Sequence, residues 1–184
     1  MIKVNDKERT LEKPSYHILI AVRRKKENRD VKEIVCRQIV RDMKTDIAVL
    51  KARISFHPGK WRIYHTVNAR LHGPASKGLQ KRLIDHPEDS YRIDTLYKTF
   101  LLKPESKATR YFLIDIDTND INQFENILDI LVKNDVQIFI AKKTPNGFHV
   151  VTNKFDTRLI SEIKDVSFQR DGYFLLEVVE VKEK

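Results

Sequence analysis

The chain of 184 residues is poor in cysteine and glycine and contains no long apolar run. Its one cysteine, Cys36, can form neither an internal disulfide nor a zinc site built from several cysteines. We therefore expect a cytoplasmic, intracellular protein in a reducing compartment. No apolar run approaches membrane-spanning length and no secretory signal is visible, so we expect no membrane partner. The five glycines are few enough that each is expected to mark a turn or a close backbone approach.

Positive charge is in excess, because 35 lysines and arginines stand against 26 aspartates and glutamates, for a net charge of +9. Such a balance favours a polyanionic partner, nucleic acid or a nucleotide. A basic protein whose charge serves only solubility is the alternative. The hydrophobic content of 41% is enough for a core, and the length suits one domain.

The order of predicted elements indicates an α+β fold over residues 15–184, after a flexible N-terminal arm at 1–14. We expect an N-terminal αβ unit at about 15–105 and a motif-bearing core at about 106–184. Strands are expected at 15–22, 61–67, 111–116, 136–142, 148–152, 166–169 and 173–181. Helices are expected at 42–55, 75–84, 90–102 and from a cap at Thr118 or Asn119. Residues 31–40 fit either a strand or a helix, and we favour a strand. The pair Asp171-Gly172 predicts a hairpin turn between the last two strands.

The stretch Arg110–Asp120 (RYFLIDIDTND) combines a strand-forming apolar run with two carboxylates. Alternate side chains of a strand share a face, so Asp115 and Asp117 point the same way, with Cα atoms about 6–7 Å apart. Two like charges on an apolar strand are costly unless a cation neutralises them. Mg²⁺, held by carboxylates and substrate phosphates, suits this pair. The alternative is that the strand ends at Ile114 and the aspartates are solvated or cap the next helix.

Two further segments carry candidate phosphate-binding groups. The turn KTPNG leads to His149, and its backbone N–H groups near Gly147, with the side chains of Lys143 and His149, can receive phosphate oxygens. A lone histidine near an apolar face is alternatively a satisfied core residue. The strand at 61–67 has Arg62, Tyr64 and Thr66 on one face and ends in Asn68 and Arg70, a polar end where open sheets bind ligands. The alternative is an asparagine turn followed by a surface arginine.

These motifs, in this order, resemble the archaeo-eukaryotic primase (primase-polymerase) superfamily over roughly residues 60–175. The matching elements are LIDID with Asp115 and Asp117, TPNGFHV with His149, and YHTVNAR with Asn68 and Arg70. The resemblance implies an RRM-like mixed or antiparallel sheet with packed helices. It also implies two Mg²⁺ or Mn²⁺ ions held by the aspartates and a later acidic residue, and contact between His149 and the nucleotide phosphates. The implied reaction joins NTPs or dNTPs on a nucleic-acid template by two-metal phosphoryl transfer.

The third metal ligand is where the sequence departs from the family pattern. The candidates are Asp171, Asp165 and Glu177, of which Asp171 is preferred because it ends a predicted strand. Without a third ligand the domain would bind nucleotides or nucleic acid without polymerising them. The chain also lacks the zinc module and helicase segment that often accompany such domains, so we expect a minimal phage- or mobile-element-like version that works with a separate helicase.

Two other functions remain open from the sequence. A metal-dependent nuclease would use the same aspartates, histidine and basic surface to hydrolyse phosphodiesters. A non-enzymatic RRM-like module would depend on exposed aromatics that stack bases, and no strand shows that pattern clearly.

Overall fold

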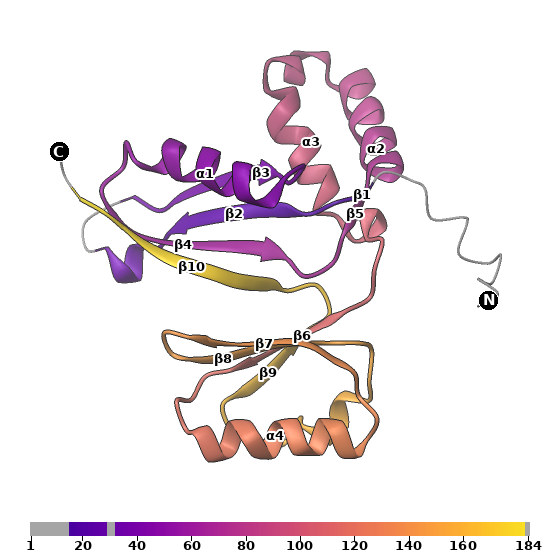
Figure 1. Cartoon of the computed structure of the whole chain (residues 1–184). Helices are drawn as coiled ribbons and strands as arrows, with labels where there is room; N and C mark the ends of the chain where they lie inside the picture. The colour runs from indigo at the N-terminus through magenta and orange to yellow at the C-terminus, as the bar shows by residue number, and fades with distance from the viewer. Residues whose placement is uncertain (1–14, 29–31, 183–184) are drawn as a thin grey trace, which may run out of the picture. The chain divides into compact units, whose positions relative to one another are not determined.

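The computed structural model describes residues 15–28 and 32–182, so the expected arm at 1–14 lies outside the described residues. The chain packs as two compact units (Figure 1). Among the described residues, the helical unit contains residues 15–16 and Ala69–Ala108, and the two-sheet unit contains residues 17–28, 32–68 and 109–182. One junction, at 108/109, lies near the expected boundary at about 105, whereas the junction at 68/69 interrupts the expected N-terminal unit.

The first sheet of the two-sheet unit has the strand order β10-β4-β2-β3, with every neighbouring pair antiparallel. Its strands are β2 (Ile18–Arg23), β3 (Ile34–Ile39), β4 (Gly59–Thr66) and β10 (Tyr173–Val181). Helix α1 (Met43–Ile54) begins after Asp42, whose side chain accepts a hydrogen bond from the Thr45 N–H at 2.8 Å. Leu50 and Ile54 of α1 pack with Trp61 on one face of the sheet. That face is therefore apolar, and polar side chains are left to the other.

The second sheet of this unit has the order β7-β8-β6-β9, again antiparallel throughout. Its strands are β6 (Phe112–Ile116), β7 (Ile138–Thr144), β8 (Gly147–Thr152) and β9 (Val166–Gln169), with a short 3₁₀ helix η5 (Thr157–Leu159) before β9. Helix α4 (Ile121–Lys133) buries Ile127 and Leu131 against Ile114 and Ile116 of β6. The cap of α4 is Asp120, which accepts from the Asn122 N–H, so the expected cap at Thr118 or Asn119 is wrong.

The helical unit contains a two-stranded ribbon of β1 (Ser15–Tyr16) and β5 (Arg70–Leu71), followed by two packed helices. Its other elements are α2 (His72–Asp85), the 3₁₀ helix η3 (Pro87–Arg92), α3 (Ile93–Leu101) and the 3₁₀ helix η4 (Pro104–Ser106). The single strand expected at 15–22 is thus divided, because β1 pairs in the helical unit and β2 in the two-sheet unit. Across residues 15–28 and 32–182, no helix combines the length and apolar character needed to cross a bilayer.

The α+β class is confirmed, but the expected hairpin at Asp171-Gly172 is wrong. Strand β9 pairs with β6 in the second sheet, whereas β10 pairs with β4 in the first. The segment between β9 and β10 therefore crosses from one sheet to the other. Gly172 suits this crossing because a Cβ there would lie 2.6 Å from the Leu113 side chain, and its carbonyl accepts from the Val67 N–H at 3.0 Å.

Candidate functional site in the two-sheet unit

Strand β6 places the first aspartate on the face of the second sheet that α4 does not cover. Ile114 and Ile116 point into the core under α4, so the intervening Asp115 points to the opposite face, where its side chain is 27% exposed. Asp117 follows the end of β6, is exposed, and donates its backbone N–H to the Asp165 carbonyl at 2.8 Å. The two carboxylates therefore project from the end of a buried strand that holds their backbone in place.

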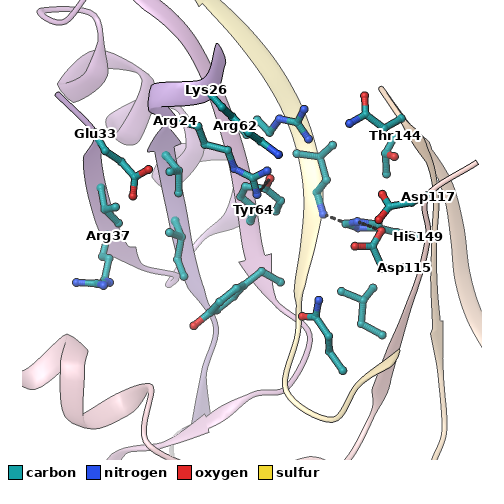
Figure 2. A pocket seen from close by; sticks show the side chains of 18 residues that line it. Arg24, Lys26, Glu33, Arg37, Arg62, Tyr64, Asp115, Asp117, Thr144 and His149 are labelled. Atoms are coloured by element: carbon teal, nitrogen blue, oxygen red, sulfur yellow. Dashed lines mark hydrogen bonds and ion pairs between the residues drawn. The ribbon is translucent and has the colours of Figure 1, made fainter. Parts of the chain in front are cut away.

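Both aspartates line a cavity of about 760 Å³ within the two-sheet unit. The second sheet contributes a wall that we call the carboxylate wall, made by Asp115, Asp117, Thr144, Asn146 and His149. The first sheet and the 3₁₀ helix η2 (Lys25–Glu27) contribute a wall that we call the basic wall, made by Arg24, Lys26, Arg37, Arg62 and Tyr64, with Glu33 at its β3 side. Figure 2 shows both sets of side chains around the cavity.

His149 lies directly beside Asp115. The two residues are direct cross-strand partners on β8 and β6, and the Nε2 of His149 lies 3.3 Å from Oδ1 of Asp115 (Figure 2). The other ring nitrogen, Nδ1, accepts a hydrogen bond from the Leu175 N–H of β10 at 3.1 Å. His149 is only 7% exposed, so both ring nitrogens are committed to protein groups in this structure.

The basic wall is preorganised by bonds among its own residues. The Arg24 guanidinium lies over the Tyr64 ring and donates to its hydroxyl at 2.8 Å. The Nε of Arg62 donates to both carboxylate oxygens of Glu27, at 2.9 and 3.1 Å. Burial works to raise the pKa of Glu27, but the hydrogen bond and charge of Arg62, with smaller contributions from Lys60 and Arg24, hold that pKa below its usual value.

One arginine of this wall has a donor nitrogen that forms no hydrogen bond with the described residues. The Nε of Arg37 is buried and has no hydrogen-bond partner among the described residues. A buried, unpaired donor is costly unless a ligand or water satisfies it. Its presence in the lining of the cavity is therefore consistent with an anionic ligand there.

The structure does not bring all the expected phosphate-binding residues to the cavity. Gly147 is buried at the start of β8, and Lys143 is exposed on β7 outside the cavity lining. Asn68 is fully buried and bonds the start of β6: its Oδ1 accepts from the Tyr111 N–H at 2.7 Å, and its Nδ2 donates to the Tyr111 carbonyl at 3.1 Å. Arg70 is 1% exposed and belongs to the helical unit.

None of the three candidates for a third acidic ligand lines the cavity. Asp171 lies in the crossing between the sheets, where its Oδ1 is 3.5 Å from the Asn68 Nδ2. Glu177 on β10 forms an ion pair with Lys51 of α1 at 2.7 Å. Asp165 has a left-handed backbone, with φ of 61°, and its carbonyl bonds the Asp117 N–H.

The available oxygen ligands still suit a hard cation in part. Among the described residues, no set of three or more His, Cys, Asp or Glu side chains is arranged to hold a metal ion. The carboxylates of Asp115 and Asp117 can supply ligands to Mg²⁺ or Mn²⁺, which commonly take the remainder from substrate phosphates and water. The pair therefore fits a cation whose remaining ligands are water molecules or substrate phosphates.

The basic wall contains functional candidates that the sequence indicates only weakly. The basic cluster at residues 23–26 fits either a solvated loop or a contact to a phosphate backbone, and the alternation of 61–67 already places Arg62 and Tyr64 on one face. No local signal places either segment near Asp115, because they line the same cavity only when the two sheets pack together. Comparisons with protein-family models, curated proteins and solved structures found no match to this chain.

Proposed function

We propose that the two-sheet unit is a primase-polymerase-like nucleotidyltransferase that joins NTPs or dNTPs on a nucleic-acid template. The observation that carries this proposal is the cavity in which Asp115, Asp117 and His149 lie on one wall and Arg24, Lys26, Arg37 and Arg62 on the other. A volume of about 760 Å³ lies in the range of small-molecule sites and suits a nucleoside triphosphate.

The arrangement of the second sheet supports an RRM-like core. Its elements follow the order β6–α4–β7–β8–η5–β9, and the spatial order β7-β8-β6-β9 puts β6 and β8 in the centre. This is the β-α-β-β-α-β pattern with the 3₁₀ helix η5 in place of the second helix. The central strands carry Asp115 and His149 where a base-stacking module would present aromatics, which favours chemistry over stacking on this face.

In this proposal the aspartates bind the metal ion and the basic wall binds the phosphates. Asp115 and Asp117 hold Mg²⁺ or Mn²⁺, and a bound ion supplies charge neutralisation to the phosphates. The cations of the basic wall bind phosphate oxygens and orient the triphosphate, as arginine and lysine commonly do. The net charge of +9 suits a nucleic-acid template, and a separate helicase would supply single strands to the site.

Calorimetry of triphosphate binding, with and without Mg²⁺ or Mn²⁺, tests the proposal. Wild type is expected to bind an NTP or dNTP in a metal-dependent way, and the double variant Asp115→Ala/Asp117→Ala is expected to lose that binding while it stays folded. The matched control is Glu125→Ala/Asp129→Ala, which removes two exposed carboxylates of α4 and should bind as wild type does.

A primer-synthesis assay on single-stranded template then tests the reaction itself. Metal-dependent synthesis that the aspartate variant loses and the α4 control retains supports the proposal. Degradation of DNA or RNA with Mg²⁺ alone, without added nucleotide, would instead assign the site to a nuclease. Unchanged activity in the aspartate double variant would rule out this cavity as the active site.

A second candidate function is nucleotide binding without transfer. It is favoured by the positions of Asp165, Asp171 and Glu177, which all lie outside the cavity lining, so the usual third carboxylate does not come from these residues. This function predicts metal-dependent triphosphate binding with no primer synthesis. A Glu177→Ala variant should leave that binding unchanged, because the Glu177 carboxylate is paired with Lys51.

A further inference from the structure

Strand β10 contains a β-bulge beside the candidate site. Leu175 pairs with Tyr64 of β4, and the next paired residue, Glu177, lies opposite the next residue, Ile63, so Leu176 is the extra residue. Two backbone groups at this bulge bond side chains of the other sheet. The Leu175 N–H donates to Nδ1 of His149, and the Leu176 carbonyl accepts from Nζ of Lys142. Bulges recur beside functional sites because they redirect local groups in this way.

The side chains that meet the bulge form a row across the second sheet. Lys142 of β7 is the direct cross-strand partner of His149 of β8, and His149 is the partner of Asp115 of β6. Cross-strand partners point to the same face of a sheet, so the three side chains lie side by side. The bulge therefore contacts a row that ends at the carboxylate wall of the cavity.

The hydrogen bond from β10 fixes which nitrogen of His149 carries the proton. A neutral imidazole has one N–H donor and one acceptor nitrogen. Because the Leu175 N–H occupies the lone pair of Nδ1, the ring hydrogen lies on Nε2. Nε2 lies 3.3 Å from Oδ1 of Asp115, and a nitrogen that carries the hydrogen can donate only to an acceptor such as this carboxylate oxygen. The donor role of His149 toward Asp115 is thus set by a backbone group of the first sheet.

We propose that His149 is a positioning residue that holds one oxygen of Asp115 and leaves the other for a cation. This inference rests on the proposed metal site at Asp115 and Asp117, and it assigns His149 a role in orienting a metal ligand rather than in contacting the nucleotide phosphates. Partners that orient a ligating group in this manner change metal affinity about 10–100-fold when they are removed.

Nitrogen NMR of the imidazole ring tests the hydrogen-bond arrangement without any metal or activity. At mildly alkaline pH, the His149 ring is expected to carry its hydrogen on Nε2, with Nδ1 unprotonated, and the Asp115→Ala variant should shift the Nε2–H resonance. A ring with its hydrogen on Nδ1, or one that exchanges freely between the two forms, would overturn the proposal.

Mn²⁺ affinity in the absence of nucleotide, measured by electron paramagnetic resonance of the free ion, tests the consequence. His149→Gln keeps an amide donor near the position of Nε2, whereas His149→Asn keeps only an acceptor near Nδ1. We expect Mn²⁺ affinity to fall at least about tenfold in His149→Asn and His149→Ala, and to fall less in His149→Gln. His57→Gln, an exposed histidine outside the cavity lining, is the control and should bind as wild type does.

The outcomes separate this inference from the proposed function. If wild type binds Mn²⁺ and triphosphate but His149→Asn and His149→Ala retain full Mn²⁺ affinity, the positioning role is wrong while the site stands. A loss confined to triphosphate affinity would assign His149 to the phosphates. A wild-type protein that binds no Mn²⁺ would overturn both proposals together.

Discussion

Gly147, the first residue of β8, lies directly against the backbone at the end of β6. A Cβ at this position would lie 1.8 Å from the Ile116 carbonyl oxygen and 2.9 Å from the Thr118 N. The two atoms flank Asp117, so the absence of a side chain at Gly147 allows the start of β8 to approach the end of β6. Gly147 thus has a clear steric role beside the candidate site.

Gly147→Ala is expected to be destabilising because a methyl group cannot fit without moving β6 or β8. Overpacking of this kind costs about 1–3 kcal/mol, which urea unfolding can measure as a loss in the free energy of unfolding. Gly73→Ala is the control, since a Cβ at Gly73 meets nothing within 4 Å. Equal stability of the two variants would show that β6 and β8 are less closely apposed than described.

Asn68→Ala should lower stability without changing the nucleotide affinity of the folded protein. The substitution leaves the partly buried N–H of Tyr111 without its 2.7 Å partner, a loss of about 1–3 kcal/mol. Chemical unfolding and calorimetry of the same samples measure the two effects separately. Asn119→Ala, an exposed asparagine, is the control. A selective loss of triphosphate affinity at full stability would restore the phosphate role expected from the sequence.

The Glu27–Arg62 ion pair is expected to contribute to stability at neutral pH but not in acid. The folded-state pKa of Glu27 lies below its unfolded value, which is about 4.3 for a glutamate. The contribution is therefore fully present above the unfolded pKa and is lost as pH falls through the lower, folded-state pKa. Glu27→Gln should cost about 1–3 kcal/mol at neutral pH.

Urea unfolding of wild type and Glu27→Gln across a pH series checks this dependence. The difference between the two proteins should shrink toward zero as the medium becomes strongly acidic. Glu33→Gln, which replaces an exposed glutamate, is the control and should cost much less than Glu27→Gln at neutral pH. A difference between wild type and Glu27→Gln that grows in acid would contradict the direction of the pKa shift.

The basic wall should discriminate ligands by phosphate number. Lys26→Ala/Arg37→Ala removes two cations of the cavity and is expected to weaken triphosphate binding at least about fivefold, with a smaller effect on a monophosphate. The matched control is Lys77→Ala/Lys81→Ala on α2, which removes the same charge from exposed positions of the helical unit. Equal losses of triphosphate affinity in the two double variants would show that only the net charge of the protein matters.

The α+β class and the carboxylate pair were accessible from the sequence because both depend on short-range periodicity. Asp115 and its neighbours Ile114 and Ile116 point to opposite faces of one strand, and the two-residue period of a strand predicts this arrangement. The position of His149 after a Gly-containing turn likewise put it on a neighbouring strand. The short distance between His149 and Asp115 depends on strand register, which the two motifs alone do not specify.

The rest depends on contacts that local sequence does not encode. An Asp-Gly pair reads as a hairpin turn, yet Gly172 crosses between sheets because its neighbours are Leu113 and Val67. Asn68 reads as the polar end of a strand, yet its side chain bonds Tyr111, which is 43 residues away. In both cases the local signal identified an unusual residue, and long-range packing decided its role.

Asn68 also bonds Thr109, through Oδ1 and the threonine Oγ1 at 3.0 Å, so the chain leaves and re-enters the two-sheet unit at one point. On the far side of this point, the Ala108 N–H donates to the Ala69 carbonyl at 2.8 Å. Residues 69–108 therefore form an insertion whose two ends are held together by hydrogen bonds. Loop closure of this kind makes the intervening length nearly irrelevant to the rest of the fold. Evolution can lengthen, shorten or replace such an insertion while the paired aspartates keep their places.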